Sequence, residues 1–174
     1  MPLPDGTAAH RASAAARPPL RCAVLTVSDT RTAATDTSGP RACALLREAG
    51  HEVVHTALFP NDEARVRAAV AQLVESASAD VVLLSGGTGL SSRDRSVEAV
   101  TPLFERTIPG FGELFRLVSF QEQIGAAAVL SRAVAGSARG VLIVALPGSQ
   151  AAVELALTRL LLPELAHIVY DLRR

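Results

Sequence analysis

The stretch Asp80-Val-Val-Leu-Leu-Ser-Gly-Gly-Thr-Gly89 runs from a short apolar segment directly into three glycines among four residues. The apolar part is typical of a strand that is buried on both faces of a sheet. Glycines carry no Cβ, so the backbone N–H groups of the turn can approach an anion closely. The sequence therefore predicts a buried strand that ends in an anion-binding turn.

Three further strand-like runs and several helical patterns alternate along the chain. Ser38, Asn61 and Ser96 are candidate N-caps of helices. The alternation predicts an α/β fold, a three-layer α/β/α domain with a mainly parallel sheet covered on both faces by helices. The additional strands are expected at Cys22–Val27, 51–59 and Gly140–Ala145, and the helical patterns at 38–48, from residue 61, at 109–123 and after residue 149.

The N-terminal residues differ from the rest of the chain. Residues 1–19 are rich in Ala, Pro and Arg without any periodicity, which predicts a disordered tail. Residues 20–174 are expected to form a single domain, since a chain of 174 residues can bury roughly 70% of its unfolded surface in one domain.

Composition excludes several classes of function. Lys+Arg and Asp+Glu both total 17, so no net field favours nucleic acid or an anionic membrane. All the basic residues are arginines, which excludes catalysis by a lysine. Cys22 and Cys43 form no CxxC motif and are expected to be buried. No apolar run reaches the roughly 20 residues of a membrane span, and no secretory signal is visible, so we expect a soluble, cytoplasmic protein.

Three loops with unusual chemistry follow predicted strands, and such loops gather beyond the carboxyl ends of a parallel sheet. Ser85–Ser96 adds hydroxyl groups and arginines to the glycines, without the spacing of a P-loop or a dinucleotide fold. In Ser28–Gly39, Asp36 and Ser38 are either site residues or a helix cap, and the scarcity of aromatics argues against a flavin. Pro147-Gly-Ser149 is either a structural turn or an anion site at a helix start.

Two aspartates are candidates for catalysis. Asp62 stands at a helix start, where an acid ordinarily interacts with the helix dipole. Asp94 follows the glycine turn by five residues, and a carboxylate beside a bound phosphate needs a divalent cation between them. That makes Asp94 the stronger candidate for magnesium. No His/Cys/Asp metal cluster and no nucleophilic triad is visible.

Taken together, the motifs resemble the MoaB/Mog family of molybdenum cofactor biosynthesis proteins. In order and spacing they cover nearly everything from residue 21 to 160. The combination of GGTG, RD and PGFGE is far more specific than any one of these motifs. The matching segments are Leu25-Thr-Val-Ser-Asp-Thr30, Asp36-Thr-Ser-Gly39, Pro60-Asn-Asp-Glu63, Ser85-Gly-Gly-Thr-Gly89 with Arg93-Asp94, Ile108-Pro-Gly-Phe-Gly-Glu-Leu-Phe-Arg116, Leu130-Ser-Arg132 and Leu146-Pro-Gly-Ser149.

The resemblance implies an enzyme that joins molybdopterin to AMP from ATP with magnesium and releases pyrophosphate. It also implies a trimer, sometimes a hexamer, and contacts with other enzymes of the same pathway. By motif, it implies catalytic and metal-binding roles for Asp62 and Asp94. It implies ligand-binding roles for Ser28, Asp36, Ser38, Gly39, Gly86, Gly87, Thr88, Gly89, Arg93, Pro147, Gly148 and Ser149.

Two other interpretations stay open. Leu90–Asp94 and Phe115–Phe120 resemble the MoaB branch more than the Mog branch, and the resemblance allows for MoaB-like members without adenylylation activity. The chain would then be a molybdopterin-binding or scaffold protein. Asp62 and Asp94 favour activity, since a pure binding protein has little reason to hold acids beside phosphates. A flavodoxin-like carrier is the third interpretation.

Overall fold

A computed structural model describes residues 19–174, so the predicted N-terminal tail lies outside the described residues except for its last position. In the described chain, one six-stranded sheet has the strand order β2-β1-β3-β6-β5-β4. The strands are β1 (Arg21–Val27), β2 (Glu52–Phe59), β3 (Val81–Ser85), β4 (Arg106–Thr107), β5 (Val134–Ala138) and β6 (Val141–Leu146).

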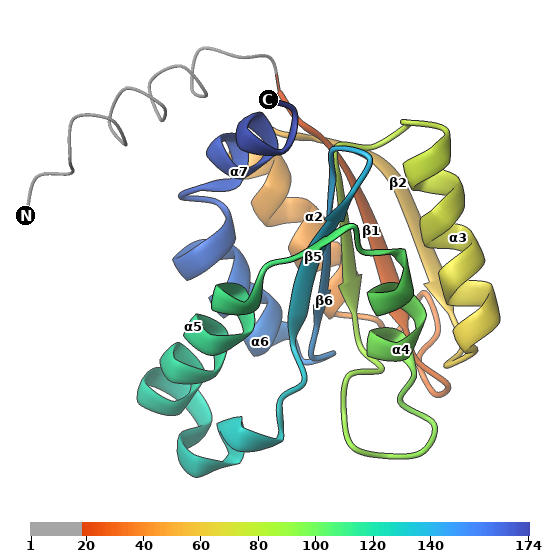
Figure 1. Cartoon of the computed structure of the whole chain (residues 1–174). Coiled ribbons are helices and arrows are strands. Elements are labelled where there is room, and N and C mark those ends of the chain that lie inside the picture. The colour runs from red at the N-terminus through yellow and green to blue at the C-terminus, as the bar shows by residue number, and fades with distance from the viewer. Residues whose placement is uncertain (1–18) are drawn as a thin grey trace, which may run out of the picture.

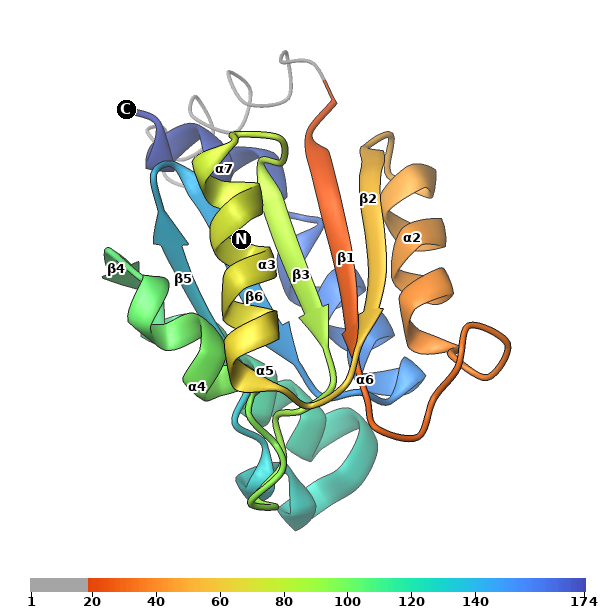
Figure 2. The same ribbon diagram turned by 90° about the vertical axis from the view of Figure 1, so that its right-hand side faces the viewer.

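The four neighbouring strands β2, β1, β3 and β6 are parallel, as predicted, and their carboxyl ends meet at one edge of the sheet (Figure 2). Cys22 of β1 pairs with Val81 of β3, and Val81 pairs with Leu142 of β6. β5 and β4 extend the sheet in the antiparallel direction. The sequence did not predict these two strands.

Helices cover both faces of the sheet and make three layers (Figure 1). One face packs against α2, α5, α6 and α7, and the other packs against α3 and α4. The helices are α2 (Ser38–Glu48), α3 (Glu63–Glu75), α4 (Ser96–Val100), α5 (Pro109–Ser119), α6 (Gln150–Leu155) and α7 (Leu165–Leu172), with shorter 3₁₀ or π segments η1 (Thr101–Leu103), η2 (Phe120–Ile124), η3 (Gly125–Leu130) and η4 (Ala156–Leu161).

Alternating side chains of the central strands divide between two apolar cores. Leu83 of β3 faces the core that contains α2 and α5, while its neighbour Leu84 faces the core that contains α3. This alternation is the reason for the continuous apolar runs in the sequence. Cys22 and Cys43 are buried in the first of these cores, as predicted, and burial raises the pKa of the Cys22 thiol to about 12.

Three predicted N-caps are displaced by one or two residues. The helix cap at α2 comes from the Asp36 carboxylate, which accepts the N–H groups of Ser38 at 3.1 Å and Gly39 at 3.2 Å. At α3 the cap is Asp62 and not Asn61. Ser96 is the first residue of α4, and its hydroxyl donates to the carbonyl oxygen of Gly86 at 2.7 Å. Neighbouring polar residues are equivalent for a sequence pattern, so the pattern places a cap only to within one or two residues.

The connections after β1 and β3 leave the sheet in opposite directions. β1 leads to α2 on one face, and β3 leads to α4 on the other. Between two adjacent strands with this arrangement a crevice opens at the carboxyl ends, which is where open α/β sheets bind ligands. Within residues 19–174, no helix is long and apolar enough to cross a membrane.

Candidate functional site

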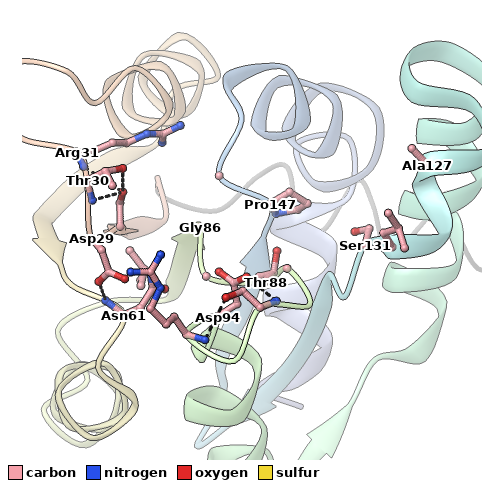
Figure 3. Close-up of a pocket in the computed structure, with 18 of the residues that line it drawn as sticks. Asp29, Thr30, Arg31, Asn61, Gly86, Thr88, Asp94, Ala127, Ser131 and Pro147 are labelled. Atoms are coloured by element: carbon pink, nitrogen blue, oxygen red, sulfur yellow. Dashed lines mark hydrogen bonds between the residues drawn. The ribbon is translucent and has the colours of Figure 1, made fainter.

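A pocket of about 600 Å³ lies at the carboxyl ends of β1 and β3 (Figure 3). Asp29 and Asn61 lie on one side of it, Ala127 and Ser131 on the other, and Thr88 lies between them. The lining residues are Val27, Ser28, Asp29, Thr30, Arg31, Asn61, Gly86, Gly87, Thr88, Gly89, Ser91, Arg93, Asp94, Ile124, Ala127, Leu130, Ser131, Pro147 and Gly148.

The first two glycines of the turn have backbone conformations that other residues rarely adopt. Gly86 has a φ of +105° and Gly87 a φ of +66°. A Cβ on Gly86 would overlap the carbonyl oxygen of Val27, so the turn lies directly against the end of β1. The Gly86 N–H also donates to the carbonyl oxygen of Leu146 at 2.9 Å, which ties the turn to the end of β6. Glycine is therefore required at both positions.

Three consecutive backbone donors remain in this turn. Within the described residues, the N–H groups of Gly87, Thr88 and Gly89 have no hydrogen-bond acceptor. Buried backbone N–H groups are nearly always paired, and Thr88 is only 3% exposed. All three residues line the pocket. Successive N–H groups without partners form a concave anion-binding site.

Two charged residues follow the turn on the pocket wall. Asp94 is half-buried, and its Oδ2 accepts the Ser91 N–H at 3.1 Å. Its Oδ1 accepts no hydrogen bond from another described residue. A Cβ on Gly89 would be only 2.6 Å from Asp94 Oδ2, so the absence of a side chain there gives the carboxylate room. Arg93 is exposed at the rim.

Asp29 and Asn61 connect the first loop to the start of α3. The Asn61 N–H donates to Asp29 Oδ1 at 2.8 Å. Hydrogen bonds from the backbone and side chain of Asn61 lower the pKa of Asp29 below its ordinary value, and the nearby Arg93 charge adds to the effect. The Oδ1 atom of Asn61 is buried and has no hydrogen-bond partner among the described residues.

Asp36, Ser38 and Gly39 lie outside the pocket lining and support it from behind. The guanidinium of Arg31, which lines the pocket, donates to Ser38 Oγ at 2.7 Å and lies 3.6 Å from the Asp36 carboxylate. Thr26 donates to Asp36 Oδ2 at 2.6 Å. Burial would raise the pKa of Asp36, but the hydrogen bonds from Thr26, Gly39 and Ser38 outweigh it and lower that pKa. Asp36 therefore stays ionised and orients Arg31.

The loop after β6 was predicted to be either a structural turn or an anion site, and its residues differ in where they lie. Pro147 and Gly148 line the pocket, and a Cβ on Gly148 would be 3.1 Å from the Cα of Gly86. Ser149 does not line it. Its hydroxyl accepts the Ala152 N–H at 3.1 Å and caps α6, the structural alternative for this residue.

The two predicted catalytic acids are in different environments. Asp94 lines the pocket, whereas Asp62 is exposed and caps α3 by accepting the Arg65 N–H at 3.0 Å. The residue before Asp62 in the sequence, Asn61, lines the pocket instead. Asn61, Asp29 and Arg31 were not predicted as site residues. Asn61 and Asp29 lie within motifs that support the family resemblance, and Arg31 lies in the loop Ser28–Gly39.

The pocket can accommodate a magnesium ion that a phosphate ligand shares. Within residues 19–174, no group of three or more His, Cys, Asp or Glu side chains could hold a metal ion by itself. Magnesium, however, is usually held by one or two carboxylates, with phosphate oxygens and waters as the remaining ligands. The free Oδ1 of Asp94, beside three unpaired N–H groups, matches that donor set.

The sequence and the fold of this chain match a known protein family. A family model described as a probable molybdopterin binding domain matches residues 23–167. The chain belongs to that family. The match covers both the pocket and the sheet that carries it, so the resemblance to the MoaB/Mog family is confirmed.

The relatives are similar to this chain over nearly their whole length. This chain is 44% identical to molybdenum cofactor biosynthesis protein B of Bacillus subtilis (strain 168). The alignment extends over 155 residues and covers 89% of this chain and 91% of the relative. A crystal structure of a molybdenum cofactor biosynthesis protein B is 45% identical, with a TM-score of 0.86 and coverage of 90% and 97%. The tungsten cofactor synthesizing protein MoaB from Pyrococcus furiosus is 36% identical, with a TM-score of 0.82 and coverage of 91% and 100%.

Proposed function

We propose that this protein acts in molybdenum cofactor biosynthesis by joining molybdopterin to AMP from ATP, with release of pyrophosphate. One observation carries the proposal. Three N–H groups of the turn that have no acceptor and the carboxylate of Asp94 line the same pocket. The names of the similar proteins support the pathway. The pocket chemistry supports the reaction.

The chemical step is a displacement at phosphorus. A terminal phosphate oxygen of molybdopterin forms a bond to the α-phosphorus of ATP, and the bond from that phosphorus to the α–β bridging oxygen breaks. The electron pair leaves with pyrophosphate. The attacking phosphate is already an anion at neutral pH, so no general base has to create it. The absence of lysine and of a histidine in the pocket lining is therefore compatible with the reaction.

The protein has to align two anions that repel each other and stabilise the leaving group. The N–H groups of Gly87, Thr88 and Gly89 are donors for a phosphate group. The guanidinium groups of Arg31 and Arg93 contribute positive charge from the loops after β1 and β3. Magnesium, when bound, neutralises phosphate charge, and we propose that Asp94 holds it.

The role of Asp62 follows from its contact with α3. A residue that caps a helix from outside the pocket fixes where the helix begins, and the helix start determines where Asn61 lies. We therefore propose Asp94 as the acid that acts on the substrates. A binding function without turnover is the second candidate, and the observation that favours it is this placement of Asp62.

We also propose that the protein forms a homo-oligomer, a trimer or a hexamer. A continuous segment of the chain, α5 to η3, exposes at least half of each of several large apolar side chains, two of which also line the pocket, and exposed apolar patches often mark contacts with another protein. These residues are Leu114, Leu117, Phe120, Ile124, Val129 and Leu130. Light scattering on the purified protein measures the state directly, and a monomer at micromolar concentration would contradict this proposal.

The function is tested by measuring pyrophosphate release from ATP by the purified protein. The expected release requires both molybdopterin and magnesium and stops with a chelator. Tight binding of molybdopterin without any release of pyrophosphate would instead support the binding function.

A further inference from the structure

Arg132, between η3 and β5, has no role in the pocket described so far. Its guanidinium nevertheless makes the densest set of contacts to the glycine loop. Nε donates to the carbonyl oxygen of Gly89 at 2.9 Å and to that of Thr88 at 3.3 Å. The Nη2 atom donates to the carbonyl oxygen of Asp94 at 3.0 Å. One side chain thus connects the glycine turn with the last residue of the loop segment that lines the pocket.

The side chain of Glu98 fixes the guanidinium in place. Both Glu98 carboxylate oxygens accept from Arg132, through Nη1 and through Nη2. The hydrogen bond from Arg132 lowers the pKa of Glu98, so this carboxylate stays ionised at neutral pH. The pair is partly shielded, with Arg132 28% exposed and Glu98 34% exposed. A planar guanidinium can serve a carboxylate and several carbonyl groups at once, which an ammonium group cannot.

The carbonyl contacts determine where the N–H groups point. The described chain contains no cis peptide bond. In a planar trans peptide the C=O of one residue and the N–H of the next point in opposite directions. When the carbonyls of Thr88 and Gly89 point at Arg132, the N–H groups of Gly89 and Leu90 must point away from it. Arg132 itself does not line the pocket, whereas Thr88 and Gly89 do.

We propose that Arg132 is a positioning residue, which holds the carbonyl groups of Thr88, Gly89 and Asp94 on the side away from the pocket. It thereby keeps the N–H group of Gly89, one of the three donors of the glycine turn, available to a phosphate ligand. The inference rests on the proposed function only in that the pocket binds phosphate. It is independent of whether the bound ligands react.

The test compares Arg132→Lys with a matched control, Arg67→Lys. Arg67 is also partly exposed and donates to two carbonyl oxygens, those of Ala99 and Glu98, and to the Glu63 carboxylate. It joins α3 to α4 and does not contact the glycine loop. The probe is inorganic pyrophosphate with magnesium, measured by isothermal titration calorimetry, and the thermal midpoint of each variant is measured in parallel.

Arg132→Lys is expected to weaken pyrophosphate binding about tenfold. This is the effect expected when one or two charge-assisted hydrogen bonds that position the donors are lost. Arg67→Lys is expected to change binding less than about twofold for a similar shift in thermal midpoint. For the larger truncation Arg132→Ala, added guanidinium ion at millimolar concentration should restore part of the binding, and methylammonium should restore less, because only guanidinium has the required fork.

Three results would overturn the proposal. These are equal binding by the two lysine variants, a loss of binding in Arg132→Ala that guanidinium does not relieve, and a wild-type protein that does not bind pyrophosphate. Failure of the proposed function is distinguishable from each of them. A wild-type protein that binds pyrophosphate and shows the Arg132 dependence, but forms no adenylylated pterin, refutes the enzyme activity and leaves the positioning role intact.

Discussion

The amide oxygen of Asn61 lies where a side chain on Gly87 would begin, since a Cβ at Gly87 would be 2.6 Å from Asn61 Oδ1. The start of α3 is therefore packed directly against the glycine turn. Asn61 also donates its N–H to Asp29, so one residue connects the loops after β1, β2 and β3. The geometry of the pocket depends on all three loops and not on the glycine motif alone.

We predict that Gly87→Val abolishes pyrophosphate binding. The substitution forces a β-branched side chain into a φ of +66° and places its Cβ against Ser96 and Asn61, so the turn has to move. Calorimetry measures the binding, and circular dichroism checks that the protein is folded. Gly110→Ala is the control, because a Cβ there meets nothing within 4 Å. Unchanged affinity in Gly87→Val would show that the turn does not hold the phosphate.

We predict that Asp94→Asn lowers turnover by about 100-fold or more while molybdopterin binding changes less than about threefold. Asparagine keeps an oxygen acceptor for the Ser91 N–H, so the loop should stay in place. The matched variant is Asp62→Asn, in which asparagine also keeps the helix cap. Steady-state rates of pyrophosphate release compare the two.

Asp62→Asn is expected to retain turnover within about threefold, because the Asp62 side chain lies outside the pocket lining. A loss as large as that of Asp94→Asn would support the sequence-based prediction that both acids are catalytic. Unfolding of Asp94→Asn would assign Asp94 a structural role instead.

Most of the fold could be predicted because its strands carry strong local patterns. Three of the four parallel strands, β1, β3 and β6, are buried on both faces, so their sequences are continuous apolar runs. The fourth, β2, lies at the sheet edge and is partly exposed, and its β-branched residues identify it as a strand. β5 was missed because Val134-Ala-Gly-Ser-Ala138 has small residues and no alternation. Glycine is needed at position 136 because a Cβ there would overlap the ring of Phe104, which packs on the strand. Phe104 is distant in sequence, so no local pattern predicts this contact.

The site could be predicted at the level of loops but not of side chains. The glycine turn, Arg93 and Asp94, which the sequence pattern selected because they follow a strand closely, all line the pocket. Asn61 and Asp62 are adjacent polar residues at a helix start, and only the direction of the chain at α3 decides which one reaches the pocket. Arg132 is 43 residues from Gly89 in sequence, and no spacing rule connects them.

We predict that chelation removes activity without changing stability. In the described chain no cluster of metal-binding side chains supports the fold, so a magnesium ion would be bound together with phosphate ligands. Adding a chelator to the free protein should leave the thermal midpoint unchanged and abolish pyrophosphate release. A large drop in the thermal midpoint would point to a structural metal instead.

At the opposite end of the sheet, Asp80 should make a pH-dependent contribution to stability. It is 4% exposed and accepts hydrogen bonds from Arg21 at 2.8 Å and from Arg173 at 2.6 Å. Burial alone would raise the pKa of Asp80, but the arginines outweigh it and lower that pKa. The contribution is therefore present above about pH 4 and is lost as the pH falls through the lowered value.

Asp80→Asn should lower the free energy of unfolding by about 2 kcal/mol at pH 7 and flatten the loss of stability below pH 4. Urea titrations across that pH range measure both effects. Glu122→Gln breaks an exposed pair with Arg159 and should cost less than about 0.5 kcal/mol. Equal effects of the two substitutions would show that the buried contacts of Asp80 add nothing.

The most direct test of the proposed reaction follows the α-phosphorus of ATP. The purified protein is incubated with molybdopterin, magnesium and ATP labelled at the α-phosphorus or, in a second reaction, at the γ-phosphorus. Attack at the α-phosphorus predicts that the α label appears in the pterin product and the γ label in pyrophosphate, and that Asp94→Asn forms both products at least about 100-fold more slowly. Pterin that stays unlabelled while it is tightly bound would contradict the adenylylation and leave a binding protein.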